Sequence, residues 1–205
     1  NYADETRRSR EFFALTTTKY YFEYFLNLIS PGGGLVDFGD ADFPGNWSIY
    51  VYLLERGATE YRDGGMKWGA HFIFDANKEI KANSPTQEIE AHSFQILEAY
   101  LGADDSVEES MPTSGSRQVL EDAVGKKVVF RSNWDRNALY LMLNYQGRED
   151  YGLDGRNHLW STINVEAEKN HHGHADENAI CQLMSEGTIL LHESGYRETS
   201  TTGAH

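Results

Sequence analysis

The chain has 205 residues, 40% of them hydrophobic and 13% aromatic, which is enough to build one packed domain or two small ones. Its formal net charge of −14 argues against nucleic-acid binding, because phosphate recognition needs a basic surface. The sequence has no apolar run of about 18 residues that could span a membrane, and its single cysteine cannot form an internal disulfide.

Residues 3–29 are expected to be helical, because apolar side chains recur there at three- and four-residue spacing. The β-branched run Thr16-Thr17-Thr18 predicts a break into two helices. The glycine-rich residues 30–34 should end the second helix. An aromatic stripe of this kind is more typical of a core than of a sugar-binding platform. Its members are Phe12, Phe13, Leu15, Tyr20, Tyr21, Tyr24, Phe25 and Leu28.

Further helices are predicted at residues 47–54, 67–74 and 87–101, with glycine-containing breaks at 60–65 and 102–105. His71 and His92 stand alone within these helices and are expected to be packing or surface residues rather than ligands. These helical hairpins are of the kind from which an incomplete (α/α) toroid can be built. We therefore expect residues 1–112 to be a helical, toroid-like segment, with helix persisting to about Ser110.

The pattern changes to short strands after Pro112. Residues 118–120, 127–131, 138–143 and 159–165 are rich in β-branched, aliphatic and aromatic residues and are divided by Gly and Asn/Asp turns. Residues 113–205 are therefore predicted to be an antiparallel β-sheet or sandwich domain, mostly strand from about Arg117 onward. The fold class expected for the whole chain is α+β.

Histidines gather in residues 170–178, where His171, His172 and His174 fall within four positions. In an extended strand His172 and His174 would share a face with Asn170, because side chains two positions apart point the same way. Paired imidazoles can bind a divalent metal, and an imidazole can also transfer protons near neutral pH. A polar turn that is merely rich in histidine remains the alternative.

A β-hairpin is predicted directly after this segment. Residues 179–183 form an apolar-rich run, residues 185–187 form a turn at Gly187, and residues 188–192 form the returning strand. Antiparallel pairing would bring His192 and Glu193 back toward the histidine-rich segment. These two residues are thus a second set of potential ligands.

The run HHGHADENAICQLMSEGTILLHESGY, which begins at His171, resembles the signature of the heparinase II/III-like polysaccharide lyases. VVFRSNWDRNALYLMLNYQG, from Val128, resembles the strand pair that precedes it in that family, and YFEYFLNLISPGGGLVDFGD, from Tyr21, resembles the end of the family's toroid. Glu193 departs from the aspartate usual before the glycine. Family members are several hundred residues long, so the chain resembles the middle of such an enzyme.

The resemblance implies β-elimination of a uronate-containing polysaccharide. His172 matches the catalytic histidine, and Tyr2 fits the place of the catalytic tyrosine, with Tyr20 and Tyr21 as competitors. The family residue that neutralises the substrate carboxylate would lie upstream of Asn1. The candidate substrate-binding residues are Asn170, Tyr196 and Arg197.

The resemblance also implies a structural metal held by His174 and Glu193, with His205 as the third ligand and His192 in reserve. Zinc is favoured because imidazole suits it, and calcium is the alternative. The other readings are a metal-dependent hydrolase and a non-catalytic carbohydrate-binding or structural fragment. The expected partner is an anionic polysaccharide, a homodimer is left open, and a periplasmic or secreted bacterial location follows from the resemblance alone.

Overall fold

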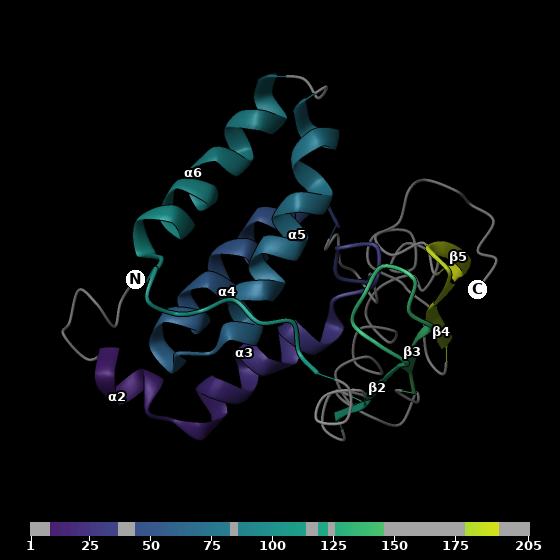
Figure 1. The fold of residues 1–205 in the computed structure, drawn as a ribbon. Helices are drawn as coiled ribbons and strands as arrows, with labels where there is room; N and C mark the ends of the chain where they lie inside the picture. Colours follow the sequence, from purple (N-terminus) through teal and green to yellow (C-terminus); the bar gives the residue numbers. More distant parts are fainter. Residues whose placement is uncertain are drawn as a thin grey trace, which may run out of the picture. The chain divides into compact units, whose positions relative to one another are not determined.

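The fold is α+β in the computed structural model, which describes residues 9–36, 44–82, 86–113, 119–122, 126–145 and 179–192. Within these ranges the chain contains five α-helices and one five-stranded antiparallel sheet (Figure 1). The helices and the sheet belong to two separate compact units. No helix in the described ranges is long and apolar enough to cross a membrane.

The helical unit follows the order expected from the sequence. Its elements are α2 (Ser9–Phe13), α3 (Thr16–Leu28), the short 3₁₀ helix η1 (Pro44–Asn46), α4 (Trp47–Tyr61), α5 (Gly64–Ala82) and α6 (Thr86–Gly102). The predicted break near the threonine run is present, but it falls at Ala14 and Leu15, and the threonines begin α3. Leu15, rather than a threonine, is the N-cap of α3, and no side-chain hydrogen bond caps this end of the helix.

The connection between α4 and α5 is only two residues long, shorter than the break predicted at 60–65. Arg62 adopts a left-handed conformation with φ of 51°, which ends α4. Asp63 then caps α5: its Oδ1 accepts hydrogen bonds from the backbone N–H groups of Gly65 at 2.8 Å and Met66 at 3.1 Å. The helix therefore starts on the Gly-Gly pair that composition alone assigns to a loop.

Helix α4 is the centre of the helical core, since it packs against α3, α5 and α6. Leu54 on α4 is fully buried, as are Met66 and Ile73 on α5 and Leu26 on α3. The aromatic stripe is divided: Phe13 and Phe22 are buried, whereas Tyr20 and Tyr21 are about half exposed on the outer side of α3.

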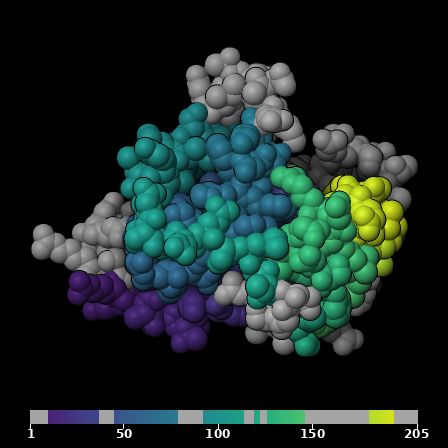
Figure 2. Space-filling model, in the orientation of Figure 1, coloured from purple at the N-terminus to yellow at the C-terminus, as the bar shows by residue number. Residues whose placement is uncertain are grey.

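Residues 103–113 are not helical, so the expectation of helix to about Ser110 is wrong. We refer to these residues as the 103–113 segment. In Figure 2 the teal surface of α6 and the segment after it lies across the blue surface of α4 and α5. Among the contacts that hold it there, Ser110 N–H donates to the carbonyl of Gly64 at 3.0 Å, and Lys67 Nζ donates to the carbonyl of Asp104 at 3.0 Å.

The sheet unit is an antiparallel meander in the order β1-β2-β3-β4-β5. The strands are β1 (Val119–Asp122), β2 (Lys127–Arg131), β3 (Tyr140–Asn144), β4 (Ala179–Ser185) and β5 (Thr188–His192). The predicted spans of β2 and β5 are confirmed residue for residue. The expected strand at 159–165 lies outside the described residues.

One face of the sheet is its packed side. Val129 on β2 and its partner Met142 on β3 are fully buried, as is Tyr140 two rungs further along β3, and Trp134 from the β2–β3 connection is 2% exposed. The opposite face is also apolar, but Phe130 and Ile180 on it are 44% and 40% exposed. Edge strand β5 is exposed along its whole length.

Candidate functional site

The β-hairpin that directly follows the histidine-rich segment is described by the structure. Strand β4 begins at Ala179, one residue beyond the segment, and β5 returns antiparallel to it, so the predicted hairpin is confirmed. Glu186 and Gly187 form its turn with φ values of 51° and 71°. Positive φ at both central residues matches the right-handed twist of the two strands.

His192 ends the return strand opposite Gln182, the fourth residue of β4. The register shifts between Leu183 and Met184, which changes the alternation of side chains along the hairpin. His192 is exposed, whereas Gln182 beside it is 7% exposed. The hairpin therefore carries the chain back along β4 toward its start, as expected, with Glu193 as the next residue.

The proposed catalytic, substrate-binding and metal-binding residues lie outside the described parts of the chain, so their mutual positions stay predictions. They are His172, Tyr2, Asn170, Tyr196, Arg197, His174, Glu193 and His205. Of the residues named for the metal, only the reserve ligand His192 is described. Within the described ranges no group of three His, Cys, Asp or Glu side chains could hold an ion.

A buried arginine lies on β2, one strand away from this hairpin. Arg131 is 7% exposed, and its guanidinium lies 3.8 Å from the ring centroid of Trp134 and 5.2 Å from that of Tyr140. Loss of hydration lowers the pKa of Arg131 to about 10, while burial raises that of Tyr140. Both groups keep their ordinary charge at neutral pH, so this stack serves as a structural anchor for the β2–β3 connection.

A second polar cluster lies in the helical unit, where the sequence indicated none. Glu55 on α4 is 5% exposed, and its Oε2 lies 4.0 Å from Nε2 of His71 on α5. The other ring nitrogen of His71, Nδ1, is 2.7 Å from Oε2 of Glu109 in the 103–113 segment. Burial raises the pKa of Glu55, partly offset by His71 and Lys67.

The two lone helical histidines have different surroundings. His92 follows the expectation of a packing residue: its ring lies 4.9 Å from that of Trp47, and Nδ1 is 2.7 Å from Oγ of Ser48. His71 is half exposed and joins two carboxylates. Glu109 lies 38 positions from it in sequence, so periodicity could not reveal the contact. The acidic residues that follow α6 in the sequence were the feature that could have indicated this contact.

No known protein family, curated protein or solved structure matches this chain. Its function is therefore inferred from its own residues and from the resemblance noted in its sequence.

Proposed function

We propose that this protein is a polysaccharide lyase that cleaves a uronic-acid-containing polysaccharide by β-elimination. The observation that carries the proposal is the histidine-rich segment 170–178 followed at once by the β4–β5 hairpin. The similarity of this sequence to heparinase II/III-like lyases supplies the reaction class. In this proposal the helices are the end of an incomplete (α/α) toroid, and the sheet is one layer of a sandwich.

The reaction needs two proton transfers. A base removes the proton from C5 of the uronate, the electron pair forms a C4–C5 double bond, the bond from C4 to the glycosidic oxygen breaks, and that oxygen takes a proton. We assign these transfers to His172 and Tyr2. Negative charge builds on the uronate carboxylate as the C5 proton leaves, so a neutralising group must lie close to it.

Substrate binding has to overcome the charge of the protein. The net charge of −14 repels a polyanion at long range. A local cation is therefore needed, and Arg197 can pair with a carboxylate through two parallel hydrogen bonds. Asn170 and Tyr196 would complete the contacts to the sugar.

The proposed metal is zinc, held by His174, Glu193 and His205. Its role is structural: it fixes the strand on which His172 lies, and it contributes no group to the elimination. The predominance of imidazole among these ligands favours zinc over calcium.

The test compares two adjacent histidines in the full-length natural protein. His172→Ala should lower turnover of uronate polymers about 100-fold or more, the usual effect of removing a general acid–base group. His171→Ala, on the other face of an extended strand, should keep turnover. Activity is followed by the ultraviolet absorbance of the new double bond. Unchanged turnover in His172→Ala would contradict the assignment.

Elemental analysis of the same proteins separates catalysis from metal binding. The parent, His172→Ala and His171→Ala proteins should contain zinc, and His174→Ala should lose it. Loss of the metal from His172→Ala would move this residue to the ligand set. Consumption of polymer without new absorbance would favour the metal-dependent hydrolase, and binding without turnover would favour the non-catalytic module.

A further inference from the structure

The cluster of Glu55, His71 and Glu109 joins three elements of the helical unit. Glu55 comes from α4, His71 from α5 and Glu109 from the 103–113 segment. The imidazole lies between the two carboxylates, and each ring nitrogen faces one of them. Glu55 Oε2 is buried and has no hydrogen-bond partner. A proton on Nε2 of His71 would therefore point toward an acceptor that has no other partner.

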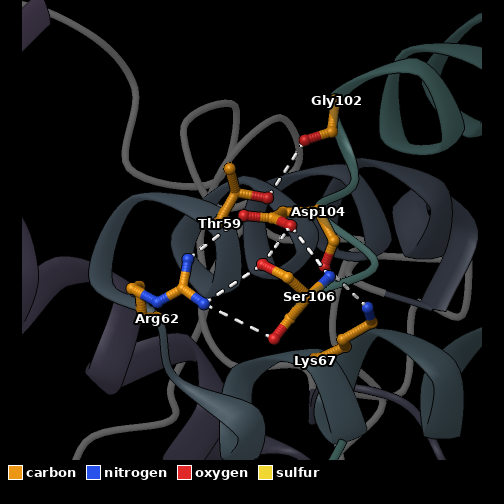
Figure 3. Close-up of polar contacts among 6 residues, drawn as sticks. All are labelled: Thr59, Arg62, Lys67, Gly102, Asp104 and Ser106. Atoms are coloured by element: carbon orange, nitrogen blue, oxygen red, sulfur yellow. Dashed lines mark hydrogen bonds and ion pairs between the residues drawn. The ribbon is translucent and has the colours of Figure 1, made fainter. Parts of the chain in front are cut away.

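The 103–113 segment has several other attachments, and Val107 in its middle is 5% exposed. Near its start, Arg62 donates to Asp104 Oδ2 at 3.3 Å and to Ser106 Oγ at 3.1 Å (Figure 3). Lys67 holds the carbonyl of Asp104, as the same figure shows. Near the other end Ser110 bonds to Gly64.

The attachment at Gly64 leaves no free space. A Cβ placed on Gly64 would overlap the carbonyl oxygen of Glu108 and lie 2.6 Å from Ser110 Oγ. The backbone of the segment therefore lies directly on the first turn of α5. The Ser110 amide can exchange with solvent only when this contact opens, so it reports whether the segment is attached.

The charges around Glu55 make this attachment depend on protons. The groups that face it are Lys67 and His71 from α5 and Asp105 and Glu109 from the segment. With a neutral His71, three carboxylates face one lysine. When His71 is charged, two cations face these carboxylates, Lys67 and His71. His71 then links α4 and α5 to the segment.

We propose that His71 is a proton-controlled latch: its charged form ties Glu109 to Glu55 and holds the 103–113 segment on α4 and α5, and its neutral form loosens that hold. The segment should be bound most tightly at mildly acidic pH, where histidine side chains carry a proton. The cluster links elements that are distant in sequence. It includes none of the residues of the proposed lyase site.

Amide hydrogen exchange at Ser110 tests the latch. After correction for the intrinsic pH dependence of exchange, its protection should rise roughly two- to fivefold between about pH 8 and pH 5, the scale of one partly exposed ion pair. The amide of Ile73, in the buried core of α5, serves as the internal reference. Protection of Ser110 that does not change with pH would overturn the proposal.

Variants at neighbouring carboxylates identify the group responsible. His71→Gln and Glu109→Gln should each abolish the pH-dependent gain, whereas Glu108→Gln, on the exposed residue beside Glu109, should keep it. If His71→Gln lowers the global stability, Glu109→Gln gives the same test with both helices unchanged. A gain that persists in Glu109→Gln, or that is lost equally in Glu108→Gln, would overturn the proposal.

Discussion

The helical unit and the sheet unit bury their apolar residues in different ways. Helix α4 has neighbours on several sides, so Leu54 in its middle is completely buried. The sheet buries one face, at Val129 and Met142, and leaves edge strand β5 exposed, with Leu190 at 56%. Residues in α4 and on the packed face of β2 and β3 should therefore contribute most to the free energy of unfolding, and residues in α6 and β5 should contribute less.

The largest effect should come from truncating the centre of the helical core. Leu54→Ala leaves a cavity near Leu26 and Ile29, whose side chains meet that of Leu54 around Gly69, and should lower the free energy of unfolding by about 3–5 kcal/mol. Leu97→Ala on α6, where the side chain is 52% exposed, should cost about 0.5 kcal/mol or less. Equal losses in chemical denaturation would contradict the central place of α4.

The sheet unit offers the same contrast at a smaller scale. Met142→Ala should cost about 2–4 kcal/mol, since methionine is flexible and its neighbours relax into part of the space. Leu190→Ala on β5 should cost about 0.5 kcal/mol or less. Denaturant titration of both variants measures the difference. A large loss in Leu190→Ala would show that β5 is covered in solution.

The smallest effect concerns two carboxyl groups whose pKa values shift in opposite directions. Burial raises the pKa of Glu55, so its contribution to stability is full at low pH and is lost as pH rises through the folded value. Hydrogen bonds from Ser106 lower the pKa of Asp104, so its contribution is present at higher pH and is lost as pH falls.

Melting temperatures measured across the acidic range test these signs. Relative to Glu55→Gln, the parent protein should become less stable as pH rises above the ordinary carboxyl pKa. Relative to Asp104→Asn, it should become more stable as pH rises toward the ordinary carboxyl pKa from below. The same slope in both comparisons would contradict the assigned environments.

Local sequence patterns predicted most of the described elements. The spans of β2 and β5, and the turn at Gly187, follow from alternation and glycine chemistry within a few residues. The α4–α5 junction was predicted in the right place but too long, because Arg62 takes a left-handed conformation that its residue type rarely adopts and ends α4 abruptly. Helix was expected to continue to about Ser110, but residues 103–113 are not helical, and their contacts come from Gly64 and Lys67, far away in sequence.

The two clusters of polar residues also differ in whether their members are close together in the sequence. Residues 170–178 could be singled out because their histidines are adjacent in sequence, and their arrangement remains a prediction. The cluster at His71 could not be singled out, since only the packing of α4, α5 and the 103–113 segment brings its members together. Sequence reasoning therefore finds sites that are local in the chain and misses those assembled by the fold.

The proposed elimination of uronate polymers can be read from the masses of the products. A purified oligosaccharide containing uronic acid is incubated with the full-length natural protein, and both fragments are weighed by mass spectrometry. Elimination adds no water, so the two fragment masses should sum to that of the starting oligosaccharide, and one fragment should carry a double bond. Fragments that together are heavier by one water molecule would show hydrolysis and contradict the proposed function.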